Sequence, residues 1–133
     1  MVNWESAVSP AEDGRIDPSS GKWTALTSLH AARVASLDWQ PLREFTFTSK
    51  RGRRLHSFIV LPPGFDSTRK YPLFVLIHGG AANMWTDNIT YRWNYHLLGA
   101  PGYVLLLTDY TGSTSYGERP ARGKQFAEAI VTF

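Results

Sequence analysis

Apolar and polar residues alternate along two neighbouring runs of the chain. In REFTFTS, residues 43–49, the alternation places Phe45 and Phe47 on one face, and a second run, RLHSFIVLPPG at 54–64, follows after a short basic turn. A period of two is typical of a strand with one buried face. Two such runs joined by a short turn predict an antiparallel pair of strands.

Two later runs are almost entirely apolar, namely residues 73–77 and YVLLLTDY at 103–110. Uninterrupted apolar runs are typical of strands that are buried on both faces of a sheet. The segment NITYRWNYHLLG, residues 88–99, lies between them and carries aromatic and aliphatic residues at helical spacing. We therefore expect a helix there, since strand, helix and strand in succession form a βαβ unit with parallel strands.

The residues at helical spacing are Tyr91, Tyr95 and Leu98. Asn88 or Thr90 is the expected N-cap, and Gly99 or Gly102 the expected end. The fold class is accordingly α/β, with an antiparallel hairpin followed by a βαβ unit.

The first forty residues have a different pattern. RIDPSSGKWTALT at 15–27 has a Pro-Ser-Ser-Gly turn between two strand-like runs, which predicts a hairpin. SLHAARVASLDWQP at 28–41 is a short helix or a linker that ends at Pro41. We expect a boundary here, with residues 1–40 and 41–133 as separate units. In the second unit, GKQFAEAIVTF at 123–133 is a candidate helix.

Composition excludes several classes of function. The chain has 133 residues, of which 43% are hydrophobic, enough for a globular core, and it has no cysteine. Disulfides, thiolate zinc sites and thiol nucleophiles are therefore excluded. No apolar run approaches the ~20 residues of a membrane helix, and no signal-peptide pattern begins the chain. We expect a soluble protein, cytoplasmic or periplasmic, that does not bind a membrane.

The net charge of +3 is spread unevenly. Residues 1–40 hold three basic and five acidic side chains, and residues 41–133 hold eleven and six. Four of the cations surround Gly52 in TSKRGRRL at 48–55, between the two alternating runs. A hairpin turn must be solvated, and no recognition helix or stacking-aromatic motif accompanies these charges. We therefore expect no nucleic-acid partner.

The run at residues 73–77 leads directly into His78, Gly79 and Gly80. In α/β sheets, ligands bind at the carboxyl ends of strands, where loops and helix N-termini present free backbone N–H groups. Glycine permits positive φ and lets an anion approach the amides closely. Such a loop supplies part of the oxyanion hole in some serine hydrolases. A tight strand-to-helix turn, with a histidine that bonds only locally, explains the three residues equally well.

The ordered set of motifs favours the first interpretation. LPPGFDSTRKYPLFVLIHGG, followed by WNYHLLGAPGYVLLLTDYTGSTSYGE, resembles the catalytic domain of the prolyl oligopeptidase family of serine peptidases, particularly its bacterial dipeptidyl-peptidase-like and acylaminoacyl-peptidase-like members. The resemblance spans residues 43–118. It implies an α/β-hydrolase domain after a β-propeller, so that residues 1–40 would be a propeller remnant with a connector. Proteolysis of a peptide substrate is the implied activity.

The resemblance also implies residue roles. His78, Gly79 and Gly80 match the family's oxyanion-side loop, in which other members place tyrosine at the histidine position. Gly112, Ser113, Tyr116 and Gly117 match a loop beside the active site. Thr111 stands where many members have arginine, and Ser115 where glycine is common.

The chain contains no GxSxG, the motif that places a nucleophilic serine on a sharp turn. The nearest stretch is STSYG, in which Ser115 has Ser113 rather than glycine before it. The other histidines, His30, His56 and His96, are expected to be exposed or hydrogen-bonded in place rather than catalytic. In the family, the nucleophile, acid and base follow the matched region. We therefore expect a sequence that is truncated before the nucleophile and does not hydrolyse a substrate by itself.

Several further expectations follow. No metal-ligand spacing or phosphate loop occurs, so neither a metal nor a cofactor is expected. Without its later neighbour, the strand at 73–77 would leave an apolar edge open, which predicts aggregation unless a complementary C-terminal chain is present. An esterase, or a non-catalytic remnant that acts as a binding or assembly module, remains an alternative to the peptidase.

Overall fold

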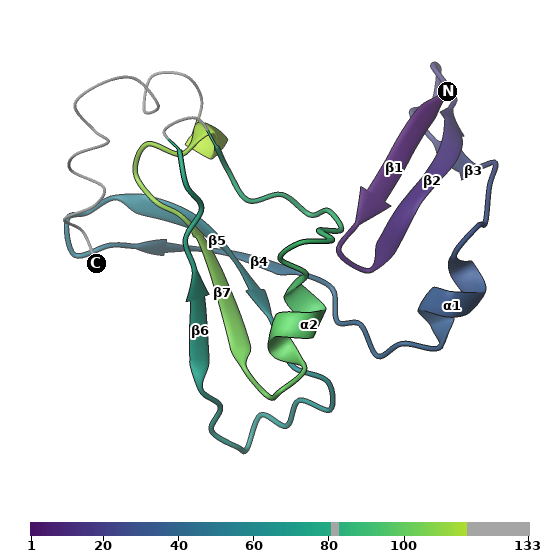
Figure 1. Ribbon diagram of the computed structural model, residues 1–133. Helices are drawn as coiled ribbons and strands as arrows, with labels where there is room; N and C mark the ends of the chain where they lie inside the picture. The colour runs from purple at the N-terminus through teal and green to yellow at the C-terminus, as the bar shows by residue number, and fades with distance from the viewer. Residues whose placement is uncertain (81–82, 117–133) are drawn as a thin grey trace.

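The computed structural model describes residues 1–80 and 83–116 of the chain. Two sheets stand beside each other in Figure 1. The first, in the order β1-β2-β3, consists of β1 (Val2–Ser6), β2 (Ser9–Ile16) and β3 (Trp23–Ala25). The second, in the order β4-β5-β7-β6, consists of β4 (Arg43–Thr48), β5 (Arg54–Val60), β6 (Leu73–Leu76) and β7 (Val104–Asp109). The helical segments are α1 (Ala31–Ala35), α2 (Tyr95–Gly99) and the 3₁₀ turn η1 (Thr114–Tyr116).

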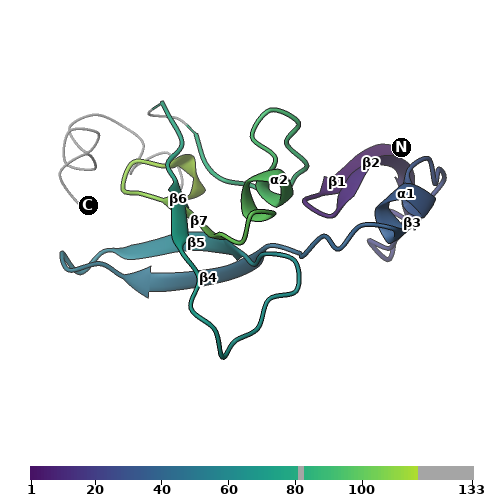
Figure 2. The same cartoon turned by 60° about the horizontal axis from the view of Figure 1, so that its bottom comes forward.

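The second sheet confirms the predicted hairpin and βαβ unit. Strands β4 and β5 are antiparallel, with Phe45 opposite Ser57, and β5 is antiparallel to β7, with His56 opposite Asp109. Strand β6 runs parallel to β7. Because the parallel pair is joined through α2, which lies over one face of this sheet (Figure 2), the α/β class is confirmed.

The helix between β6 and β7 is shorter than predicted. It begins after Asn94, whose side chain accepts a hydrogen bond from the Leu97 N–H at 3.1 Å. Neither expected cap is used: Asn88 Oδ1 accepts from the Thr86 hydroxyl at 3.1 Å, and Thr90 donates its hydroxyl to the Trp93 carbonyl at 2.8 Å. Such a side-chain bond to nearby backbone stabilises a turn at the expense of a helix, which is why the helix starts later. Its last residue is Gly99, as expected.

Strand β6 is not buried on both faces, so that prediction was wrong. It pairs with β7 alone among the described residues, and Leu73, Phe74 and Val75 are all exposed. Strand β7 has neighbours on both sides and is the buried strand. The open apolar edge that the sequence predicted is therefore present in the described part of the chain.

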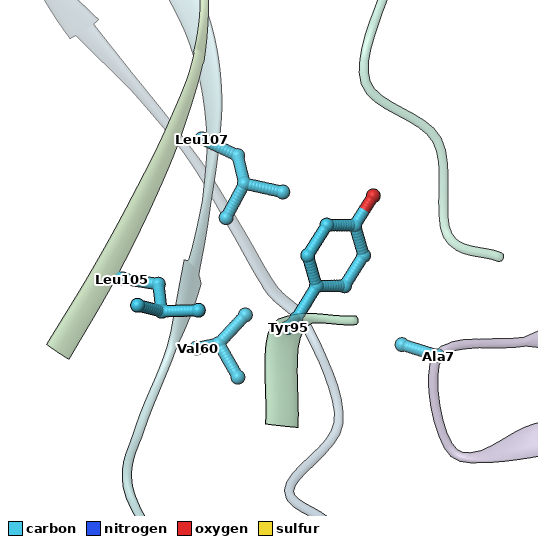
Figure 3. Packing of buried hydrophobic residues seen from close by; sticks show 5 residues of the cluster. All are labelled: Ala7, Val60, Tyr95, Leu105 and Leu107. Atoms are coloured by element: carbon cyan, nitrogen blue, oxygen red, sulfur yellow. The ribbon is translucent and has the colours of Figure 1, made fainter. Parts of the chain in front are cut away.

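The core lies between the second sheet and α2. Val60, Leu105 and Leu107 lie on one side of the Tyr95 ring, and Ala7 reaches this cluster on the other side, from the β1–β2 turn (Figure 3). Leu105 and Leu107 are completely buried. Full burial of such a side chain contributes about 1.5–3 kcal/mol, so this cluster holds α2 on the sheet.

The first sheet confirms the predicted hairpin, since Ile16 of β2 pairs with Trp23 of β3. Strand β1, which was not predicted, extends this sheet. The short helix α1 lies inside the segment expected to be a helix or linker. The candidate helix at 123–133 lies outside the described residues, and none of the helices described is long and apolar enough to cross a membrane.

Candidate functional site

Two loops meet at the carboxyl ends of β6 and β7. The first contains His78, Gly79 and Gly80, and the second runs from Tyr110 to η1. The strands are parallel, so both loops leave the same edge of the sheet. A backbone hydrogen bond from Thr114 N to the Asn83 carbonyl, 3.0 Å long, joins them.

The side chain of His78 is buried between these loops. Its Nε2 lies 2.8 Å from the Ser113 Oγ, and its ring stacks on Tyr110 with the ring centroids 4.5 Å apart. His78 is 6% exposed and Ser113 is fully buried. The imidazole is therefore a structural part of the loop, and a ligand at His78, Gly79 and Gly80 would contact their backbone rather than the His78 ring.

Gly79 and Gly80 are exposed, in contrast to His78. Gly80 has φ +81°, and a Cβ at either glycine would meet no described atom within 4 Å. The Tyr110 hydroxyl donates to the His78 carbonyl at 2.9 Å and lies 3.3 Å from the Gly80 carbonyl. Neither glycine N–H is bonded to another described residue. The loop thus holds its carbonyls inward and leaves two amide donors for an anion.

Burial raises the pKa of Tyr110, and the nearby Asp109 carboxylate raises it further. The hydroxyl therefore stays protonated over the neutral range and remains a donor to the His78 carbonyl. The pKa of Tyr116 is raised in the same way, chiefly by burial. Its hydroxyl lies 2.6 Å from the Asp109 carbonyl and accepts from the His56 N–H at 2.6 Å, which attaches η1 to the sheet.

Asp109 connects the two loops to β5. It is fully buried at the end of β7. Its Oδ1 accepts from the Trp85 N–H at 2.9 Å and lies 3.4 Å from the His78 Nε2, while its Oδ2 lies 2.9 Å from the His56 Nδ1. The His56 Nε2 lies 3.1 Å from the Glu44 carboxylate. A buried carboxylate needs such partners, so Asp109 fixes the position of the loop that follows β6.

Ser113, His78 and Asp109 are in contact, yet they do not form a catalytic triad. In a triad, the serine and the carboxylate bind opposite nitrogens of the imidazole. Here both approach Nε2, and the buried Nδ1 of His78 has no described partner. A fully buried Ser113 hydroxyl also has no access to a substrate. The contact therefore serves to position the loop.

Ser115 lies in η1 and lines a hollow of about 430 Å³. His56 lines the same hollow, but Asp109 and Glu44 occupy its two ring nitrogens. No hydrogen bond between Ser115 and a histidine is present among the residues that the structure describes. The geometry offers no base for Ser115 as a nucleophile. Gly117, the last residue matched to this loop, lies outside the described residues.

The remaining histidines are held in structural positions. The His96 Nε2 lies 2.9 Å from the Ala7 carbonyl, and its ring stacks on Trp39 with centroids 4.9 Å apart. His30 is exposed at the start of α1. No group of three or more potential metal ligands is present within residues 1–80 and 83–116.

Sequence reasoning located the glycine loop but missed Asp109 and Tyr110. The signal was the polar pair that ends an apolar run in YVLLLTDY, at the same edge as the His-Gly-Gly sequence. Parallel pairing places such a pair beside the loop. Which carbonyls and rings these two side chains contact depends on the backbone course of both loops.

The chain is similar to peptidases of known identity. It is 45% identical over 76 residues, 57% of its length, to "Dipeptidyl-peptidase 5" of Schizosaccharomyces pombe, and 36% identical over 100 residues, 73% of its length, to "Dipeptidyl-peptidase 4" of Giardia intestinalis. It spans only 11% and 13% of these two relatives. No protein-family model matches it.

A solved structure supports the same relationship. The acylaminoacyl peptidase of Pyrococcus horikoshii superposes with a TM-score of 0.75 and 27% sequence identity. The match covers 90% of this chain and 18% of that enzyme. The chain therefore matches a small part of a much longer protein.

Proposed function

Because the chain belongs to the prolyl oligopeptidase family of serine peptidases, we propose that it supplies the oxyanion-side loop of a peptide-hydrolysing site. The observation that carries the proposal is the loop after β6. Gly79 and Gly80 are exposed at the carboxyl edge of a sheet, in a backbone that Tyr110 fixes, and no described residue accepts a hydrogen bond from their N–H groups.

In this proposal, residues 41–133 form the N-terminal part of an α/β-hydrolase domain. The strand order β4-β5-β7-β6, with an antiparallel hairpin before the parallel pair, supports this assignment. Residues 1–40 would be a propeller remnant and connector, which the antiparallel sheet β1-β2-β3 supports. The bonds of Ala7 to Asp87 and His96 would then join the two domains.

The chemistry of the loop follows from the charge that develops in peptide hydrolysis. When a serine attacks the peptide carbonyl carbon, the carbonyl oxygen becomes an oxyanion, and fixed N–H donors stabilise its negative charge. Loss of one such donor costs about 2.7–4 kcal/mol of transition-state stabilisation in known enzymes. The attacking serine, its base and the orienting carboxylate would lie outside this sequence, since the chain contains no GxSxG and the described residues form no triad.

The proposal is tested by complementation. The full chain is assayed for hydrolysis of dipeptidyl and aminoacyl p-nitroanilides, alone and mixed with the part of the Schizosaccharomyces pombe relative that follows the matched segment. We expect no turnover by the chain alone and turnover by the mixture. Turnover by the chain alone that Ser115→Ala abolishes would contradict the absence of a nucleophile. Turnover of nitrophenyl esters without peptide hydrolysis by the mixture would indicate an esterase.

A matched pair of glycines tests the loop itself. Gly80 and Gly21 both have positive φ, +81° and +67°, and at both a Cβ would meet no described atom within 4 Å. Alanine at either position costs a similar backbone strain. We expect Gly80→Ala to lower kcat of the mixture at least about tenfold, which corresponds to ~1.4 kcal/mol, and Gly21→Ala, in the turn between β2 and β3, to leave it unchanged. Equal effects of both substitutions would contradict the role of the loop.

A further inference from the structure

We propose that the turn between β4 and β5 binds acidic segments of peptides, and that this binding gives the peptide-hydrolysing site a preference for acidic substrates. The substrate preference rests on the function proposed above. The turn, here called the basic tip, carries four cations in five residues, Lys50, Arg51, Arg53 and Arg54. All four side chains are exposed.

The backbone holds these cations close together. The Arg53 carbonyl accepts from the Ser49 N–H at 2.8 Å, and the Ser49 carbonyl accepts from the Gly52 N–H at 2.9 Å. Gly52, with φ +73°, allows the chain to reverse within this short turn. No carboxylate lies within 4.0 Å of any of the four cations among residues 1–80 and 83–116. Arg54 donates to the Thr46 hydroxyl at 3.2 Å, which leaves its charge unneutralised. The four positive charges repel one another, and no carboxylate of the described residues neutralises them.

The basic tip lies at the same end of the sheet as the candidate site. Strand β5 starts at the tip and runs antiparallel to β7, so that His56 lies opposite Asp109 at the carboxyl end of β7. Arg54 lies two residues before His56 in β5, and side chains two residues apart in a strand point to the same face. Both line the hollow of about 430 Å³, together with Ser115. A peptide that reaches the glycine loop can thus place neighbouring residues in this hollow and at the tip.

The charges around the hollow favour an anion but also suit a peptide backbone. Glu44 is the carboxylate of the lining, and His56 already lies 3.1 Å from it. The four cations of the tip outweigh this single negative charge. Glu44 can still accept a hydrogen bond from a peptide N–H, because its side chain is 67% exposed. An acidic peptide offers both the N–H donors and the carboxylates that this combination binds.

The same geometry disfavours a nucleic acid. Base stacking is a main source of affinity for single strands and needs aromatic rings on the face that carries the cations. The exposed rings nearby, Phe45 and Phe47, stack with centroids 6.1 Å apart. They alternate with Glu44 and Thr46, which line the hollow, and so lie on the opposite face of β4. The negative charge of Glu44 also opposes a phosphate chain.

Fluorescence anisotropy of the full chain tests the binding. The probes are a fluorescein-labelled glutamate-rich peptide, its glutamine-rich counterpart and a single-stranded oligonucleotide of similar length. We expect the acidic peptide to bind at least about tenfold more tightly than the neutral one at low salt, and less tightly as the Debye length shortens to ~10 Å near 0.1 M salt. Tighter binding of the oligonucleotide would overturn the proposal.

Two charge-matched variants locate the binding. The tip variant replaces Lys50, Arg51, Arg53 and Arg54 with glutamine. The control replaces four exposed cations elsewhere, Arg15, Lys22, Arg33 and Lys70, and thus has the same net charge. We expect only the tip variant to lose the preference for the acidic peptide, with an unchanged thermal transition in both. Equal losses would show that net charge alone attracts the peptide and would overturn the proposal.

This binding test is independent of catalysis. If the complemented mixture hydrolyses peptides but shows the same kcat/KM for acidic and neutral substrates, the proposed function stands and the substrate preference is wrong. If the acidic peptide binds through the tip and no mixture hydrolyses it, the docking surface stands and the proposed function is wrong.

Discussion

The imidazole of His96 in α2 donates a hydrogen bond from Nε2 to the backbone carbonyl of Ala7, 2.9 Å away and 89 positions earlier in the chain. The Asp87 carboxylate accepts a hydrogen bond from the Ala7 N–H at 2.7 Å. Both polar groups of Ala7 are thereby satisfied within a buried turn, as buried backbone requires. This clamp joins the first sheet to the segment that covers the second.

The clamp makes stability depend on pH in a defined direction. Burial lowers the pKa of His96 below its ordinary value of 6.5, although the Ala7 carbonyl opposes this shift. The unfolded chain therefore takes up the proton at higher pH than the folded chain does. The free energy of unfolding should be greatest above pH 6.5 and should fall as the pH drops from there toward the lower pKa of the folded state.

Urea unfolding at a series of pH values from about 5 to 8 measures this dependence. We expect His96→Gln to flatten the curve over this window and His30→Gln, at an exposed site, to leave its shape unchanged. Parallel curves for the wild type and His96→Gln would show that His96 does not carry the dependence.

Asp109→Asn should strongly destabilise the chain. The buried carboxylate accepts from Trp85 and lies against the His56 imidazole, and an amide cannot accept at both of its terminal atoms. We expect the free energy of unfolding to fall by about 2–4 kcal/mol. Denaturant titration measures the loss. Asp13→Asn, at an exposed position, is the matched control and should change stability by less than about 0.5 kcal/mol.

Tyr110→Phe should loosen the loop with little effect on the fold. It removes the hydroxyl that contacts the His78 and Gly80 carbonyls and keeps the ring that stacks on His78. We expect a loss of about 1 kcal/mol in stability, faster hydrogen exchange at Gly79 and Gly80, and a lower kcat of the complemented mixture at nearly constant KM. Tyr103→Phe, at an exposed tyrosine, should produce none of these changes.

Val75→Lys should reduce self-association. Val75 is exposed in β6, whose second side has no described strand, and a charge in an edge strand opposes pairing with another chain. Light scattering after size exclusion, over a range of concentrations, should show a smaller oligomeric share than in the wild type. Leu29→Lys adds the same charge at an exposed site outside the sheets and should not change it. If both variants self-associate as much as the wild type does, the edge of β6 is not the contact.

The local elements were largely predictable. Alternation in residues 43–60 gave the β4–β5 hairpin, and the two apolar runs gave a parallel pair joined through a helix. The helix start was misplaced because Asn88, Thr90 and Asn94 are all good cap residues, and only the course of the chain after Trp93 selects Asn94. The burial of β6 was misjudged because an apolar run records what a strand can bury, not whether a neighbour is present.

The sequence by itself determined that an apolar strand ends in His78, Gly79 and Gly80, and that this loop lies at the carboxyl edge of a parallel pair. Periodicity and glycine content act locally, so they can be read along the chain. Only the tertiary structure decided that the His78 ring turns inward, that Tyr110 holds the loop carbonyls, and that Asp109 joins the loop to β5. These contacts link residues that are far apart in sequence, and their geometry is fixed by strand pairing and loop packing rather than by any local pattern.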